Sequence, residues 1–173
     1  MKNINVARYE SAAGELILGE YEGKLCLCDW VVEGHREAVD RHIKRYIGAE
    51  YHDCVTPVIE LTIRQLDEYF RGERRTFDVP LMFVGTEFQQ SVRTELTRIP
   101  YGATISYAEL ARRVGNPKAV RAVAAANAIN PVSIIVPCHR VIGSNGSMTG
   151  YGGGLTAKKF LLELEAHTEK KVE

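Results

Sequence analysis

The sequence predicts an α+β protein in which strands precede a mostly helical second half. Segments 15–21 and 24–31 are rich in apolar, strand-forming residues, and Glu22–Gly23 between them suits a tight turn. In the second half the apolar residues recur at helical spacing instead. The chain has 173 residues, which is enough for one domain or two small ones. We therefore predict two domains, at 1–85 and 86–173.

The first half is also expected to contain two helices and a further strand. Residues 35–46 carry apolar side chains at the spacing of an amphipathic helix. A stronger helix is expected after Thr56, because threonine caps a helix N-terminus and Pro57 suits the first helical position. It stops near Gly72, and the alternation of residues 75–79 then predicts a strand.

Four helices are expected in the second half, at about residues 86–98, 106–114, 117–128 and 155–167. Ser106 and Glu109 have the spacing of a capping box, which supports the start of the second of these helices. A tight turn separates it from the third helix, which we expect to begin at Pro117. Two helices joined in this way match the helix-turn-helix arrangement.

The formal charge of the chain is divided unevenly. Residues 1–87 carry 11 Lys and Arg against 16 Asp and Glu, a net charge of −5, whereas residues 88–173 carry 11 against 6, a net charge of +5. This asymmetry indicates that the second half binds a polyanion. No apolar run approaches membrane-spanning length, and the first residues lack a signal-peptide core. We therefore expect a cytoplasmic protein, nucleoid-associated or nuclear according to the organism.

The four cysteines are too few and too irregularly spaced for a disulfide framework. Cys26 and Cys28 are two apart in a predicted strand, so we expect both to point to the same face as core residues. Cys54 and His52 could form half of a zinc site, but no second pair lies at ligand spacing. We predict free thiols and no bound metal.

The stretch 130–142 brings a cysteine and a histidine together. Its run of apolar, β-branched residues predicts a buried, extended segment that leads into Pro-Cys-His-Arg-Val. Pro131 and Pro137 restrict the backbone within this stretch. A thiol held rigidly beside an imidazole is a candidate nucleophile, which singles out Cys138 and His139. The alternative is an unreactive core cysteine, because free cysteines are among the most buried residues.

Two neighbouring segments have unusual composition. Residues 118–128 form a predicted helix of small side chains, from which Arg121 projects. Such a helix either packs closely against a neighbour or enters a narrow space such as the DNA minor groove, and different faces could serve both roles. The glycine-rich residues 143–154 either allow a ligand to approach the backbone closely or form a linker, and they lack the ending of a P-loop.

Taken together, these motifs resemble the O6-alkylguanine-DNA alkyltransferases, also called methylated-DNA–protein-cysteine methyltransferases. The resemblance runs from about Phe88 to Glu165. It implies a small ribonuclease-H-like α/β domain followed by a winged helix-turn-helix-like domain. The motifs that carry it are, in chain order, Ile105-Ser106-Tyr107, Gly115-Asn116-Pro117-Lys118-Ala119, Arg121-Ala122-Val123, Asn130-Pro131, Pro137-Cys138-His139-Arg140-Val141 and Tyr151-Gly152-Gly153-Gly154-Leu155.

The resemblance implies an irreversible, single-turnover repair reaction that needs no cofactor. Cys138 would accept the alkyl group of O6-alkylguanine, His139 would take the thiol proton through a water, and Glu165 would orient the imidazole. Asn130 would brace the segment that carries the acceptor, and Tyr107 would support negative charge as guanine leaves. The product is a thioether without a good leaving group, so each protein molecule would act once.

The resemblance also implies that a monomer of this protein binds duplex DNA and makes no contact with a membrane. The damaged base would be flipped out of the helix from the minor groove, while Arg121 fills the gap in the base stack. Carbonyl oxygens of Cys138 and Val141 would accept hydrogen bonds from the guanine amine. The DNA-facing residues would be Tyr107, Lys118, Arg121, Ala122 and Ala125, and the base pocket would include Pro137, Val141, Tyr151 and Gly152.

One departure from the family and two rival functions affect these expectations. Many relatives carry serine where this chain has Gly152, so we expect extra space here and tolerance of alkyl groups larger than methyl.

A protein that binds O6-alkylguanine without accepting the alkyl group is the main alternative, but such relatives replace the acceptor cysteine, and this chain keeps Cys138. A Cys-His hydrolase would need an oxyanion hole and an acyl pocket, and it would leave Arg121 unexplained.

Overall fold

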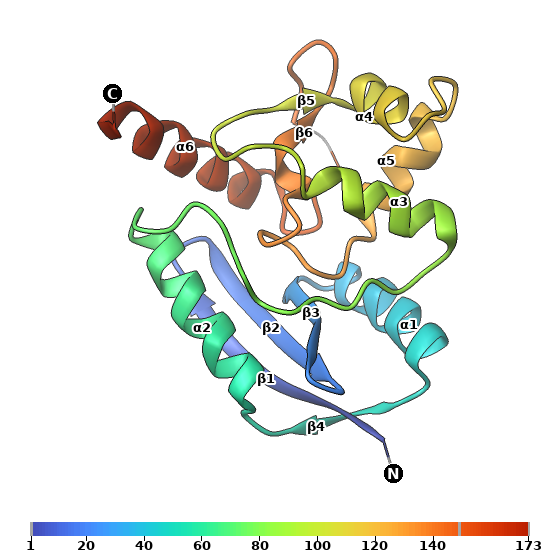
Figure 1. Ribbon diagram of the computed structural model, residues 1–173, viewed down its shortest axis with the longest axis vertical. Helices are drawn as coiled ribbons and strands as arrows, with labels where there is room; N and C mark the ends of the chain where they lie inside the picture. Colours follow the sequence, from blue (N-terminus) through green and yellow to red (C-terminus); the bar gives the residue numbers. More distant parts are fainter. Residues whose placement is uncertain (1, 149, 173) are drawn as a thin grey trace.

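The computed structural model describes residues 2–148 and 150–172, with a sheet-containing half below a helical half in Figure 1. No helix among these residues has the length and apolar character needed to cross a membrane. The strands are β1 (Asn3–Ser11), β2 (Gly14–Tyr21), β3 (Lys24–Trp30), β4 (Glu50–Asp53), β5 (Ile105–Ser106) and β6 (Val141–Ile142). The helices are α1 (His35–Ile47), α2 (Pro57–Phe70), α3 (Glu87–Leu96), α4 (Tyr107–Arg113), α5 (Val120–Ala128), α6 (Leu155–Val172) and the short 3-10 helix η1 (Cys138–Arg140).

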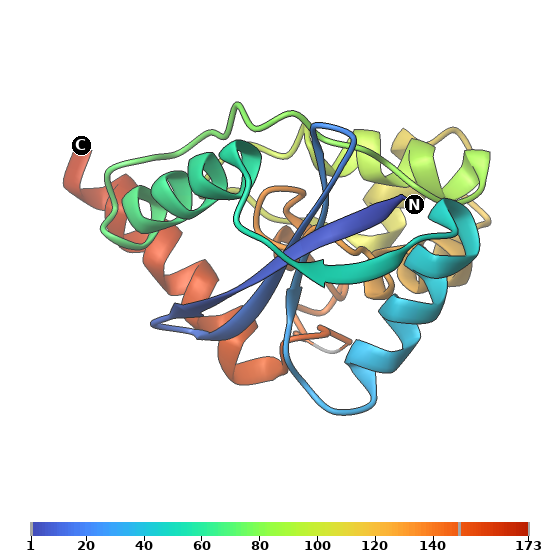
Figure 2. The ribbon, with the colours of Figure 1, turned by 90° about the horizontal axis from the view of Figure 1, so that it is seen from below.

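The main sheet has the strand order β3-β2-β1-β4, with β4 parallel to β1 and the other pairs antiparallel. Helices α1 and α2 flank it on opposite sides (Figure 2). Glu22 and Gly23 form the turn between β2 and β3, and both have the positive φ that a two-residue hairpin turn requires. A second, two-stranded sheet pairs β5 with β6 in parallel within the helical half.

A β-bulge in β3 overturns one expectation about the cysteines. Leu25 pairs with Glu20 and Leu27 pairs with Gly19, so Cys26 is the extra residue between them. Because the bulge shifts the alternation by one residue, Cys26 and Cys28 belong to different core clusters. The expectation that they share a face is therefore wrong, although both are buried.

Capping residues in the sequence predicted where most of the helices begin. Thr56 accepts a hydrogen bond from the backbone N–H of Ile59, as expected for the cap of α2. Ser106 does the same for the backbone N–H of Glu109 at the start of α4. Pro117 precedes α5 by three residues, so that helix starts later than expected.

The strand expected at 75–79 is absent, because this segment belongs to the coil between α2 and α3. Further along this coil, Leu81 pairs with the edge of β3. The backbone N–H of Leu25 donates to Pro80 O at 2.8 Å, and that of Met82 donates to Leu25 O at 2.9 Å.

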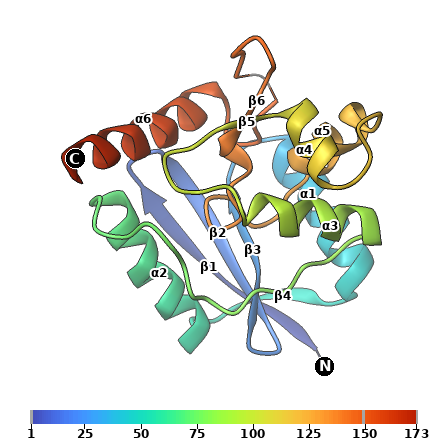
Figure 3. The ribbon, with the colours of Figure 1, turned by 45° about the horizontal axis from the view of Figure 1, so that its top comes forward.

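The two halves share one hydrophobic core and one stretch of backbone pairing. The segment that precedes the Cys-His pair lies along the β3 edge, where Cys28 N donates to Pro131 O at 2.8 Å and Ser133 N donates to Cys28 O at 2.7 Å (Figure 3). A single cluster of buried side chains crosses the boundary. Its members include Leu16, Leu18, Trp30 and Leu66 from the first half and Leu96, Leu110, Val123 and Val141 from the second.

This shared core predicts that the two halves unfold together. Trp30 is the only tryptophan, is buried at the boundary, and donates from Nε1 to the hydroxyl of Tyr151 at 2.9 Å. Urea titrations followed by tryptophan fluorescence and by far-ultraviolet circular dichroism should therefore give coincident single transitions. A fluorescence change that precedes the loss of helix would contradict a single cooperative unit.

Candidate active site

The segment that leads to the Cys-His pair is a tight turn, which corrects the expectation of an extended strand. Only Val132 bridges to β3, and the chain then reverses so that Val136 N donates to Val132 O at 3.1 Å. Ile134 sits in this turn with φ 71°, a left-handed conformation that costs a β-branched residue about 1–2 kcal/mol. The run of apolar, β-branched residues favours an extended segment here, because such a run does not reveal a turn of this kind.

Asn130 holds this turn in place. Its side-chain N–H groups donate to Val132 O at 3.2 Å and to Val136 O at 3.0 Å, while its Oδ1 accepts from Val132 N at 3.1 Å. All of these groups are buried, and the amide is a second donor to each carbonyl, because Val136 N also donates to Val132 O and Cys138 N donates to Val136 O at 2.7 Å. The amide thus fixes the backbone immediately before Cys138.

Cys138 is the first residue of η1, and only 3% of it is exposed. Burial raises the pKa of its thiol, and hydrogen bonds from Asn130 and Ser133 oppose that rise only in part. The side chain is therefore a neutral thiol at physiological pH. Since the thiolate is the reactive form, the site needs a base nearby.

His139 supplies an imidazole with one nitrogen engaged and the other available. Its Nε2 lies 2.7 Å from Oε2 of Glu165, and both side chains are buried. Burial opposes ionisation of Glu165, but His139 and Arg140 outweigh it and hold the pKa of that carboxyl well below its usual range. An ionised carboxylate can only accept, so Nε2 carries the proton and donates it.

The proton on Nε2 determines the state of the second ring nitrogen of His139, Nδ1. Burial lowers the pKa of His139 and outweighs the opposite effect of Glu165, so the ring is neutral near pH 7. With the proton on Nε2, Nδ1 has a free lone pair. This buried atom has no hydrogen-bond partner among the described residues. The ring is therefore in the tautomer and charge state of a base.

Glu165 accepts hydrogen bonds from three further residues besides His139. Arg140 donates from Nε to Oε1 at 2.8 Å and from Nη2 to Oε2 at 3.0 Å. The backbone N–H of Gly102 donates to Oε1 at 3.3 Å. Tyr69 donates its hydroxyl to Oε2 at 2.6 Å, and this residue comes from α2 in the first half of the chain. The carboxylate that orients the imidazole is thus held from both halves.

The sequence of this chain matches both domains of a known protein family. Residues 6–83 match the family described as "6-O-methylguanine DNA methyltransferase, ribonuclease-like domain", and residues 87–167 match its "DNA binding domain". A constitutive methylated-DNA–protein-cysteine methyltransferase of Bacillus subtilis is 45% identical over 168 residues, which cover 94% of this chain and 95% of that protein. The chain belongs to the 6-O-methylguanine DNA methyltransferase family.

Further proteins of this family are similar to the chain in sequence or in structure. A methylated-DNA–protein-cysteine methyltransferase of Methanosarcina acetivorans is 61% identical over 102 residues, 59% of this chain and 65% of that protein. The crystal structure of Mycobacterium tuberculosis O6-methylguanine methyltransferase has a TM-score of 0.81 at 39% identity, covering 95% of this chain and 94% of its own. The same organism's OGT in complex with DNA has a TM-score of 0.80. The predicted family and two-domain fold class are confirmed.

Residues expected to face DNA lie on the outside of the helical half. Lys118, Arg121, Ala122 and Ala125 are exposed, whereas Val123 on the opposite face of α5 is buried. The close packing expected of this small-residue helix therefore holds for its buried face, and entry of its exposed face into the minor groove stays a prediction. The positive charge of this half is less available than the sequence suggests, because three of its cations are buried. These are Arg93, Arg140 and Lys158.

The expected base-pocket residues Pro137, Val141 and Tyr151 are buried, and Tyr107 is half-buried. The expected carbonyl acceptors already have donors. Asn127 Nδ2 and Val141 N donate to Cys138 O, and Lys158 Nζ donates to Val141 O at 2.6 Å. The carbonyl of Cys138 therefore has both acceptor positions in use before any base binds.

Gly152 does not create the open space expected from its missing side chain. A Cβ built there would lie less than 3.0 Å from three atoms of the His35 ring, closer than real Cβ atoms approach. The imidazole of a residue from the first half fills the volume that a serine side chain would need. The expected tolerance of alkyl groups larger than methyl therefore loses its structural basis.

The site contains residues that sequence patterns did not single out. Tyr69 has the helical spacing of an ordinary core residue, and Asn127 and Lys158 look like surface positions on helices. Arg140 stands in the Pro-Cys-His-Arg motif, which was a signal of its involvement. Cys54 is exposed, and no group of three or more His, Cys, Asp or Glu among the described residues could hold a metal ion.

Replacing the buried carboxylate should be costly for stability. In Glu165→Gln, the Arg140 guanidinium is buried without its anion, so the free energy of unfolding should fall by about 3–5 kcal/mol. Glu163→Gln on the same helix is the matched control, since that side chain is 69% exposed and should change stability by less than about 0.5 kcal/mol. Urea denaturation measures both, and equal effects would contradict the role assigned to Glu165.

Proposed function

We propose that this protein repairs O6-alkylguanine in DNA by transferring the alkyl group irreversibly to Cys138. The supporting observation is a buried thiol next in sequence to a neutral histidine whose Nε2 is hydrogen-bonded to Glu165 and whose Nδ1 has no partner in the described part of the chain. The family and its members support the substrate, because their names describe 6-O-methylguanine in DNA. The protein is then a methylated-DNA–protein-cysteine S-methyltransferase that is consumed in the reaction.

The proposed chemistry is a displacement at the alkyl carbon. His139 Nδ1 takes the proton of the Cys138 thiol through a bridging water, and the resulting thiolate attacks the carbon. The new S–C bond forms as the C–O6 bond breaks, and the electron pair stays on the guanine oxygen. The hydroxyl of Tyr107 stabilises that negative charge, and the guanine anion takes up a proton from solvent.

Glu165 stabilises the imidazolium that forms when His139 takes the thiol proton. That proton can then be released to solvent, which restores the neutral ring. No step returns Cys138 to a thiol, because a thioether has no good leaving group. Every step uses groups of this chain, water and the alkylated base.

DNA binding is proposed to use the exposed face of α5 in the minor groove. Small side chains at Ala122 and Ala125 allow close approach, Lys118 meets a phosphate, and Arg121 occupies the gap left by the flipped base. Flipping is required because the Cys138 thiol is buried and a stacked base is out of reach. The protein is proposed to act as a monomer in the compartment that contains the DNA.

Mass spectrometry of the intact protein tests this function. After incubation with excess duplex containing O6-methylguanine, each protein should exchange one hydrogen for one methyl group, located on Cys138 by peptide mapping. Cys138→Ser should gain nothing while still binding the lesion. Lesion-selective binding by the unmodified protein without any mass gain would contradict transfer and favour the binding-only alternative.

The lowered pKa of His139 also predicts how transfer depends on pH. The base works in its neutral form, so protonation of the ring inactivates it. Because its pKa lies below the ordinary 6.5, the single-turnover rate constant should fall as the pH is lowered, with half-maximal loss below about pH 6.5. Half-maximal loss at or above pH 6.5 would contradict this assignment of the base.

A further inference from the structure

Two rings of the first half lie directly against the loop that follows the Cys-His segment. A Cβ at Gly152 would come within 3.0 Å of Cε1, Nε2 and Nδ1 of His35, so the imidazole covers this Cα. A Cβ at Gly153 would lie 2.7 Å from Cγ and Cδ2 of Trp30. Neither glycine has a positive φ, so the rings exclude larger residues and the backbone conformation does not.

The neighbouring tyrosine is held from the same side. Trp30 Nε1 donates to the hydroxyl of Tyr151 at 2.9 Å, and the two rings meet edge to face with centroids 6.0 Å apart. Three consecutive loop residues, 151–153, therefore contact the end of β3 and the start of α1.

His35 itself is anchored by a hydrogen bond to a carboxylate. Its Nε2 lies 2.9 Å from Oδ1 of Asp29, a buried carboxylate at the end of β3. The other oxygen of Asp29 accepts from Nη1 of Arg36 at 2.6 Å. The imidazole is therefore fixed between a rigid carboxylate and the loop, and Asp29 limits how far it can rotate away.

We propose that His35 is a positioning residue for alkyl transfer, which presses the loop at Gly152 toward the base pocket and limits the size of residue 152. This inference rests on the proposed function, in which Tyr151 and Gly152 border the flipped base. It gives the first half of the chain a specific part in the reaction. The loop is then placed by a side chain from another domain, and a small displacement of it slows the transfer of a correctly bound base.

A double-mutant cycle on His35 and Gly152 tests the proposal. Gly152→Ala alone should lower the single-turnover rate constant at saturating DNA on the order of 100-fold, because the new methyl collides with the imidazole. His35→Ala should lower it on the order of tenfold, since the loop loses its support. The double variant should react about tenfold faster than Gly152→Ala, because removing the ring makes room for the methyl. The dissociation constant for undamaged duplex should stay within about twofold throughout, since neither residue lies on α5 and no flipped base is bound.

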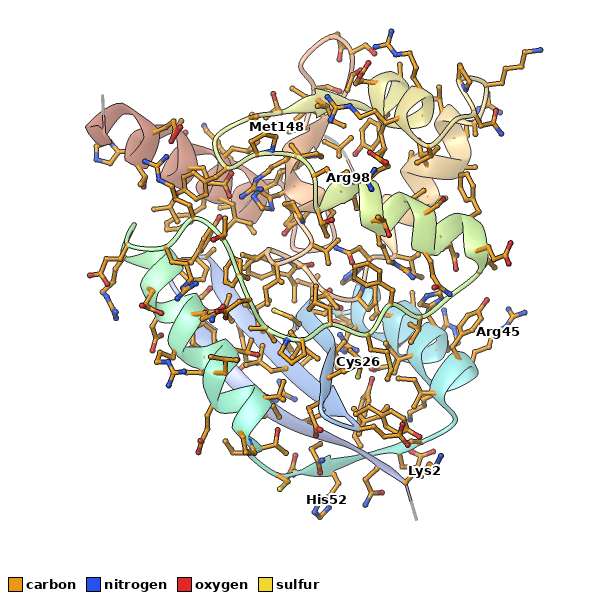
Figure 4. All side chains as sticks on the ribbon, viewed as in Figure 1. Lys2, Cys26, Arg45, His52, Arg98 and Met148 are labelled. Carbon is orange, nitrogen blue, oxygen red and sulfur yellow. The ribbon has the colours of Figure 1, made fainter. Side chains whose placement is uncertain are left out.

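A histidine remote from the site provides the control. His52 is exposed on β4, at the far edge of the sheet (Figure 4), and His52→Ala should neither change the rate nor rescue Gly152→Ala. Equal loss from Gly152→Ala with and without His35, or no loss at all, would overturn the proposal.

Thermal unfolding of the same four proteins separates this proposal from the function on which it rests. Gly152→Ala should lower the melting temperature when His35 is present and leave it nearly unchanged in His35→Ala. If the unmodified protein transfers no methyl group, the proposed function fails. The melting temperatures would still show whether the His35 ring restricts residue 152. Additive effects on the melting temperature would overturn the inference.

Discussion

The active site depends on one buried carboxylate. Glu165 accepts hydrogen bonds from an imidazole, a guanidinium, a phenol and a backbone N–H, and only 1% of it is exposed. A carboxylate taken out of water is costly unless donors surround it, and here they do. Since it remains ionised, it determines which nitrogen of His139 carries the proton. A position on the last helix thereby fixes the chemistry of a residue on η1.

The first half of the chain takes part in the site more directly than a support domain would. The β3 edge pairs with the backbone before Cys138, and Tyr69 reaches Glu165 from α2. Trp30 and His35 contact the loop that is expected to border the base. These contacts come from the β3 edge and from a helix on each side of the sheet, so the arrangement of the two domains decides the geometry of the site.

Local sequence signals predicted much of the fold, since caps such as Thr56 and Ser106 act within one helical turn. The motif around Cys138 and His139 could also be recognised, because its residues are adjacent in the sequence. Strands β1 and β4 were not predicted, and the turn at Ile134 contradicts the preference of its residue type because the Asn130 side chain compensates it. Tyr69 and His35 were missed because their roles depend on contacts between residues about 100 positions apart, which no local pattern records.

The protonation state of His139 is the central claim, and nitrogen-15 NMR of the histidine side chains at neutral pH tests it most directly. We predict a neutral ring whose Nε2 bears the proton and whose Nδ1 has the chemical shift of an unprotonated nitrogen. In Glu165→Gln this preference should weaken, because the carboxylate that holds the proton on Nε2 is gone. A proton on Nδ1, or a doubly protonated ring, would contradict the account, because the thiol of Cys138 would then have no base.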